Sequence, residues 1–165
     1  MKKLYEESEE LFSDLTIISE LDKSFDKKNY LALIDKVRSK FLNEKKSLNF
    51  YVSGNKNSRA FVSNIKDFLA KQGFNISKQA SDDSVHIQVN TTDNIHRDNF
   101  INIAVLTLHI DVKDKSQDIG GKIIILKERY NASKQSAYKN ASIHFEEDIK
   151  SQGINDTIGI NLSLD

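Results

Sequence analysis

The chain has 165 residues, a length that suits one domain around a single core. Lys and Arg together number 24, as do Asp and Glu, which excludes a general electrostatic attraction to nucleic acid or anionic membranes, a local basic patch aside. No stretch approaches the ~18–20 apolar residues of a membrane span, and the absence of cysteine excludes disulfides, thiolate nucleophiles and cysteine-bound zinc.

Two helices are predicted at the start of the chain. Apolar residues recur at helical spacing over residues 3–20. A second apolar stripe, ending near Phe41, follows the polar LDKSFD link, where Ser24 or Asp26 can cap the helix. Because the link is short, we expect a helical pair over residues 1–46 that packs antiparallel.

From residue 48 the apolar period changes from about 3.6 to 2. A short strand over residues 48–52 precedes a third helix, and Gly73 stands where a left-handed C-terminal cap belongs. Another strand begins at Phe74. This strand, helix, strand order favours parallel pairing through a right-handed connection.

Three further segments have strand patterns. Residues 85–89 alternate, and residues 104–112 keep apolar side chains at one parity, the strongest strand pattern in the chain. The segment KIIILKERY, residues 122–130, is apolar on both faces near its start, which predicts a central position in the sheet.

The chain ends with a helix over residues 133–152 and a strictly alternating segment, 158–164, which predicts a last strand. We therefore predict an α+β fold: two N-terminal helices, then a mixed sheet with helices packed on one face, a two-layer α/β sandwich. The prediction is a single domain over 1–165, with the helical pair at 1–46 and the mixed sheet at 47–165.

The stretch LHIDVKDKSQDIGGKIII, residues 108–125, crowds three aspartates and a histidine before two glycines. A calcium loop of the EF-hand type needs ligands at fixed alternate positions, and this spacing does not match. A turn between two strands needs only polar residues and glycine. We predict a turn in which Gly120 and Gly121 lie in the connection, and no metal site.

Enzymatic chemistry has one candidate set. His86 and His109 occupy the polar parity of their strands and could approach each other if those strands are neighbours, with Asp111 or His96 as a third partner. Exposed histidines on a solvated sheet face are the ordinary alternative. Since the sequence contains no nucleophile motif either, we predict that the protein is not an enzyme and needs no cofactor.

The segment SGNKNSRAF, residues 53–61, places a glycine loop between a strand and a helix N-terminus. Free backbone N–H groups and the helix dipole attract anions there, and we name Gly54, Lys56, Ser58 and Arg59 as an anion-binding candidate. The loop matches neither the P-loop nor the G-x-G-x-x-G spacing. A capped helix without a ligand is the alternative.

The order of strand, helix, GFNIS, DDSVHIQV, a long strand running to HIDVKDK, a glycine turn, KIIILKERY and SKQSAYKNASIHFEEDI resembles a family. It is similar to bacterial envelope lipoproteins whose domains look like the amino-terminal domain of TolB, including activators of penicillin-binding proteins. The likeness covers residues 48–152, although Asp82-Asp83 stands where the family has alanine-aspartate. It implies a non-catalytic domain that binds another envelope protein, through an exposed sheet edge or in assembly.

Location and partners follow from these alternatives. Four glutamates, Glu6, Glu7, Glu9 and Glu10, follow MKKLY where a signal peptide needs an apolar region. We expect a periplasmic or outer-membrane-associated protein if a signal peptide precedes residue 1, and a cytoplasmic one otherwise. The expected partner is another protein, an envelope component or a second copy in a homodimer, and the alternative function is an intracellular anion- or nucleotide-binding module at Ser53–Arg59.

Overall fold

A computed structural model describes residues 2–98, 100–131 and 133–160. The chain divides between Ser47 and Leu48 into two compact units, a helical unit and an α/β unit. The prediction of one domain over 1–165 stays a prediction. Within the described ranges, no helix has the length and apolar character needed to cross a membrane.

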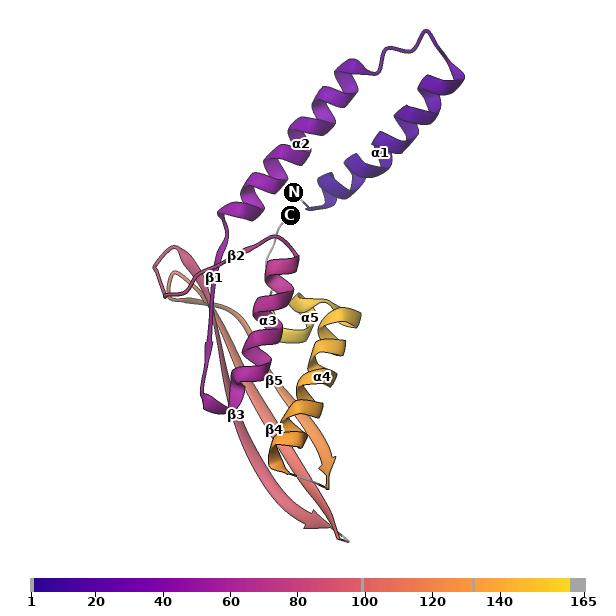
Figure 1. The fold of residues 1–165 in the computed structure, drawn as a ribbon. Coiled ribbons are helices and arrows are strands. Elements are labelled where there is room, and N and C mark those ends of the chain that lie inside the picture. The colour runs from indigo at the N-terminus through magenta and orange to yellow at the C-terminus, as the bar shows by residue number, and fades with distance from the viewer. Residues whose placement is uncertain (1, 99, 132, 161–165) are drawn as a thin grey trace. The chain divides into compact units, whose positions relative to one another are not determined.

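The helical unit is a hairpin of α1 (Lys2–Leu21) and α2 (Lys28–Ser47), as predicted. Asp26 starts α2, because its carboxylate accepts a hydrogen bond of 3.0 Å from the backbone N–H of Lys28. The helices run antiparallel, since residues from the start of α1 pack against residues near the end of α2 (Figure 1). Tyr5 stacks on Phe41 with 4.6 Å between ring centroids.

The α/β unit contains a five-stranded mixed sheet in the order β2-β1-β3-β4-β5. Strand β1 pairs parallel with β2 and with β3, whereas β3, β4 and β5 pair antiparallel. The predicted parallel crossover is therefore confirmed. The strands are β1 (Asn49–Gly54), β2 (Asn75–Ile76), β3 (Ser84–Asp98), β4 (Ile101–Asp114) and β5 (Gln117–Tyr130).

Three α-helices cover one face of this sheet, which confirms the predicted two-layer arrangement (Figure 1). They are α3 (Arg59–Lys71), preceded by the 3-10 turn η1 (Lys56–Ser58), α4 (Lys134–Gln152) and α5 (Ile154–Ile158). Phe61 of α3 and Phe145 of α4 are fully buried and meet edge to face with 5.5 Å between centroids. Alternate residues of β4, among them Leu106 and Leu108, point into the same core.

Strand β3 is longer than predicted. The sequence pattern indicated residues 85–89, but the strand continues to Asp98 and pairs with β4 along its whole length. The additional residues, NTTDNIHRD, contain one apolar side chain, Ile95, and therefore lack the apolar alternation that indicates a strand. The apolar alternation of β4 opposite them, together with hairpin register, supplies the pairing.

The prediction that residues 122–130 form a central strand is wrong. Strand β5 is an edge of the sheet, and Ile123 and Ile125 are 61% and 66% exposed. Apolar residues on both faces of a segment usually indicate burial on both faces. Here Ile124 and Leu126 pack against the helices, while Ile123 and Ile125 lie on the uncovered side.

The predicted last strand is wrong at its start. Ile158 ends α5, and Gly159 follows in a left-handed conformation with φ of 69°. The alternation at Ile158 and Ile160 comes from a helix cap, since Ile160 then makes a single antiparallel bridge with Gly120. The rest of the predicted strand lies outside the described residues.

Candidate functional site

The predicted anion loop is held to β3 by its own polar groups. The Ser58 hydroxyl is fully buried and donates to the Asn55 Oδ1 at 2.7 Å, and it accepts from the Thr91 backbone N–H at 2.9 Å. The Asn55 amide donates in turn to the Thr91 carbonyl at 2.9 Å. This network satisfies backbone groups of β3 where β1 has ended. Ser58 therefore has a structural role in the loop.

The other three candidates of this loop lie apart from that network. A Cβ atom on Gly54 would approach the Val89 carbonyl oxygen to 2.4 Å, so close packing on β3 requires glycine there. Lys56 and Arg59 are exposed. Their charges remain near the start of α3, and anion binding by this loop stays a prediction.

His86, His109 and Asp111 all lie on the sheet face opposite the helices, which we call the open face. They occupy separate register positions: His109 lies opposite Asn90 and Asp111 opposite Gln88. The His86 Nε2 is 3.0 Å from the Ser81 carbonyl oxygen, and its ring meets Tyr51. Across the described ranges, no three His, Asp or Glu side chains form a group that could hold a metal ion.

The predicted turn between β4 and β5 exists, but the glycines do not form it. Lys115 and Ser116 make the turn with φ values of 46° and 69°, while Gly120 and Gly121 lie inside β5. A Cβ atom on Gly120 would come within 2.2 Å of the Gly159 carbonyl oxygen. The glycines permit the segment after α5 to approach the backbone of β5, a long-range contact that local turn signals do not reveal.

The most prominent open feature is the outer edge of β5. Its first part is occupied, because the Gly121 N–H donates to the Gly159 carbonyl at 3.0 Å. From Ile123 to Tyr130 no strand within the described ranges pairs with that edge. We call residues 123–130 the β5 edge. On the open face its side chains are two exposed isoleucines followed by two exposed basic residues, Ile123, Ile125, Lys127 and Arg129.

A shallow depression of about 780 Å³ lies on the open face beside the start of the β5 edge. His109, Asp111, Gly121 and Ile123 contribute to its lining. Its walls are both polar and apolar, and it lies on the surface beside the β5 edge.

A polar cluster that the sequence analysis missed lies on the helix-covered side. Glu128 follows Ile124 and Leu126 at the covered parity of β5, and its carboxylate lies 2.8 Å from the His144 Nδ1 of α4. The alternation of Ile124, Leu126 and Glu128 in the sequence could have indicated that the Glu128 carboxylate faces the helices. On β3, Asp93 pairs with Lys134 at 2.7 Å. These contacts tie α4 to both strands.

Tyr138 of α4 gives this cluster a measurable property. Burial of the hydroxyl, followed by the neighbouring Asp93 carboxylate, raises the pKa of Tyr138 to about 12. The pKa of unfolded tyrosine is about 10, so the folded state binds this proton more tightly. The stabilisation is complete below about pH 10 and is lost as the pH rises through about 12.

We therefore expect the free energy of unfolding to fall more steeply with pH between about 10 and 12 in the parent than in Tyr138→Phe. Urea unfolding at a series of pH values measures both slopes. Spectrophotometric titration should also lose its last tyrosine transition in the variant. Equal slopes in parent and variant would contradict the raised pKa.

No protein-family model matches the chain, and no curated protein matches it. Similar solved structures include a minor lipoprotein from Acinetobacter baumannii, with 11% identity and a TM-score of 0.46 over 64% of this chain and 94% of that one. A neuraminyllactose-binding hemagglutinin homologue from Helicobacter pylori has 12% identity and a TM-score of 0.40, covering 68% and 88%. Rare lipoprotein B from Shewanella oneidensis has 10% identity and a TM-score of 0.37, covering 65% and 89%. At these values, the similarities establish neither a family nor a function.

Proposed function

We propose that the α/β unit is a non-catalytic protein-binding module of the bacterial envelope, which binds an extended segment of another envelope protein along the β5 edge. The observation that supports this is an edge strand with exposed isoleucines beside a row of backbone groups that no described strand pairs. An open edge of this kind can accept an additional strand through main-chain hydrogen bonds.

The side chains of the β5 edge indicate the chemistry of the added strand. Residues opposite each other on neighbouring strands contribute roughly 0.2–1 kcal/mol per favourable pair. An incoming strand should therefore place apolar residues opposite Ile123 and Ile125, and acidic residues opposite Lys127 and Arg129. The basic pair also protects the edge against nonspecific pairing.

Photo-crosslinking in the cells of origin tests this proposal. A photoreactive amino acid at Ile125 should form an adduct of one defined mass, whereas the same amino acid at Asp67, exposed on α3, should not. The partner is then purified and its binding measured by titration calorimetry. We expect amide exchange in residues 123–130 to slow in the complex, because their N–H groups enter a new ladder.

Matched variants separate this edge from other apolar surface. Ile123→Lys with Ile125→Lys should abolish binding, and Lys127→Glu with Arg129→Glu should weaken it about tenfold, since two pairs are reversed. Ile143→Lys, at an exposed isoleucine on α4, should bind as the parent does. Slowed exchange elsewhere with an unchanged β5 edge would refute the proposal.

The envelope location rests on the resemblance of residues 48–152 to TolB-like lipoprotein domains, including the penicillin-binding-protein activators. Fractionation of the source cells tests it: the protein should accompany the periplasm or outer membrane. A purely cytoplasmic distribution would remove the envelope part of the proposal and favour the alternative, an anion module at Ser53–Arg59.

That alternative has a direct test. Inorganic phosphate or nucleotide should raise the midpoint of thermal unfolding of the parent, and Lys56→Ala should reduce that shift. Lys66→Ala, at a lysine farther along α3, is the matched control. An unchanged midpoint in the parent would exclude the anion module.

A further inference from the structure

The helical unit buries little of its apolar surface. Among its described residues, the buried hydrophobic side chains are Leu15, Ile34 and Phe41. A larger number of apolar side chains remain exposed on both helices. An amphipathic helix is stable when its apolar stripe packs against another element, and a hairpin alone has no second layer to provide one.

Exposed apolar residues of α1 and α2 gather on one side of the hairpin. At 3.6 residues per turn, those of α1 lie to one side of Leu15, which faces α2, and those of α2 lie to one side of Ile34, which faces α1. Because the helices are antiparallel, the exposed apolar residues of α1 and those of α2 lie on the same side of the hairpin. We call this side the apolar face; it consists of Leu4, Leu11, Ile18, Tyr30 and Leu33.

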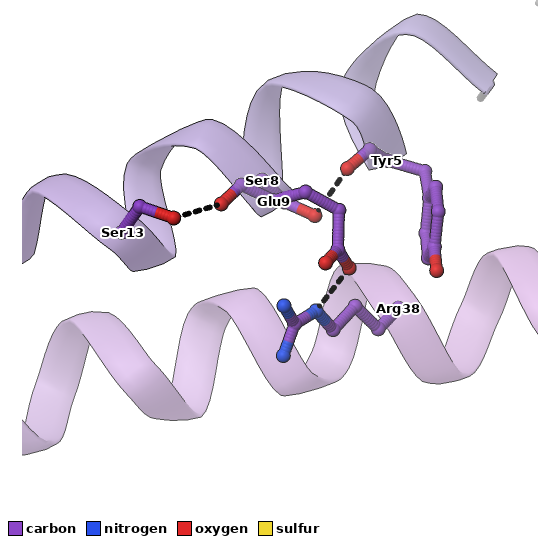
Figure 2. Close-up of polar contacts among 5 residues, drawn as sticks. All are labelled: Tyr5, Ser8, Glu9, Ser13 and Arg38. Atoms are coloured by element: carbon purple, nitrogen blue, oxygen red, sulfur yellow. Dashed lines mark hydrogen bonds and ion pairs between the residues drawn. The ribbon is translucent and has the colours of Figure 1, made fainter.

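The opposite side of the hairpin has fewer exposed apolar side chains and carries a contact between charged groups. The Arg38 Nε lies 2.7 Å from the Glu9 Oε1, as Figure 2 shows, and its guanidinium lies 4.8 Å from the ring centroid of Phe12. This ion pair and cation-π contact place charged groups among the two exposed apolar side chains of that side, Phe12 and Leu42. The apolar face, with five exposed apolar side chains against two, is therefore the side that a partner would cover.

The two helices carry opposite net charge. Helix α1 has six carboxylates and two lysines, whereas α2 has six basic side chains and two carboxylates. Acidic Asp14 borders the apolar face along α1, and basic Lys36 and Lys40 border it along α2. A surface with one acidic and one basic border is complementary to its own copy after a two-fold rotation.

We propose that two copies of the chain associate through their apolar faces into an antiparallel four-helix bundle, with α1 of each copy lying over α2 of the other. This arrangement follows from a two-fold axis parallel to the helices. It brings each acidic border against a basic one and makes every neighbouring pair of helices antiparallel. The alternative axis, perpendicular to the helices, would place α1 over α1 and bring like charges together.

The heights of the residues along the hairpin fit this assembly. The Glu9 and Arg38 pair shows which positions lie level on the two helices. Counting from that pair, Ile18 of one copy lies level with Tyr30 of the other, and Leu11 lies next to Leu33 and Val37. Apolar side chains therefore meet apolar side chains at the centre of the bundle.

The available surface is also of suitable size. A helix of this length is about 30 Å long, and two packed helices are about 20 Å wide, which gives a footprint of about 600 Å². Stable interfaces bury about 800 Å² of accessible surface per partner, and rough helical faces have more accessible area than their flat footprint. The hairpin alone can thus support a dimer.

Light scattering coupled to size exclusion tests the assembly on the full chain. The parent should have twice the chain mass of 18.8 kDa across a dilution series. Leu33→Lys should give the monomer mass with an unchanged circular dichroism spectrum. Leu33 is 62% exposed in the single chain, so folding of the hairpin does not require it.

The matched control is Leu42→Lys on the same helix. Leu42 is 45% exposed but lies on the Phe12 side, so this variant should remain a dimer. A monomeric parent overturns the proposal, and so does dissociation by both variants or by neither.

Engineered cysteines test the orientation, because the chain contains no native cysteine. Mixing an Ile18→Cys chain with a Tyr30→Cys chain should give a disulfide-linked pair on oxidation, whereas Leu11→Cys alone should not. Efficient crosslinking of Leu11→Cys to itself, without the mixed product, would show α1 over α1 and overturn the proposed axis.

Discussion

Phe145→Ala is expected to reduce the free energy of unfolding of the α/β unit by about 3–5 kcal/mol. Phe145 is fully buried on α4 and contacts Phe61, which anchors α3, so its ring joins the two long helices above the sheet. Truncation removes that buried area and leaves a cavity that a sheet with fixed register cannot close. Amide exchange of β4 residues, which report global opening of the unit, measures the loss.

An exposed phenylalanine provides the control for this experiment. Phe100 follows β3 and is 88% exposed, with the Arg97 guanidinium 5.5 Å from its ring centroid. Phe100→Ala should change stability by less than about 0.5 kcal/mol. A loss below about 1 kcal/mol for Phe145→Ala would mean that the two rings do not form the centre of this core.

Gly54→Ala is expected to destabilise the α/β unit by about 3 kcal/mol, the upper part of the range for overpacked sites. The new methyl group would lie 2.4 Å from the Val89 carbonyl oxygen and 2.9 Å from the Ser58 Cβ. Val89 belongs to β3, which pairs with β1, and Ser58 belongs to η1, which leads into α3, so neither neighbour can move without disturbing the packing around it. Urea unfolding of parent and variant gives the difference.

Gly73→Asn is the matched control. Gly73 has φ of 84° at the end of α3, and a Cβ atom there would meet nothing within 4 Å. Asparagine tolerates this conformation, so the cost should stay below about 1 kcal/mol. If Gly54→Ala unfolds like the parent, close packing against Val89 and Ser58 is not the reason for that glycine.

The sequence predicted the elements where local and long-range physics agree. Leu106, Leu108 and Ile110 alternate because one face of β4 is covered by helices, and Gly73 follows α3 because only a left-handed residue continues the chain there. Ser133 caps α4, with its hydroxyl oxygen accepting a hydrogen bond from the Ser136 N–H. These signals lie within one turn or one strand.

The errors arose where distant segments decide the outcome. Ile123 and Ile125 have the character of a central strand, but no described strand lies beyond β5 to make it central. Gly120 resembles a turn glycine, although its role is contact with Gly159, which is far along the chain. For the same reason the sequence does not reveal the roles of Ser58 and Asn55, whose hydrogen-bond partner Thr91 is distant in the chain.

The bridge between Gly120 and Ile160 limits where an additional strand could pair with β5. The bridge ends the open part of β5 on one side, so that residues 123–130 remain for pairing, which is about eight residues or about 26 Å of extended chain. A shift of one residue in the pairing register would turn the apolar side chains of the added strand to the opposite face of the sheet. If a segment adds to the β5 edge as proposed, this fixed end would set its register, although main-chain hydrogen bonds alone do not depend on sequence.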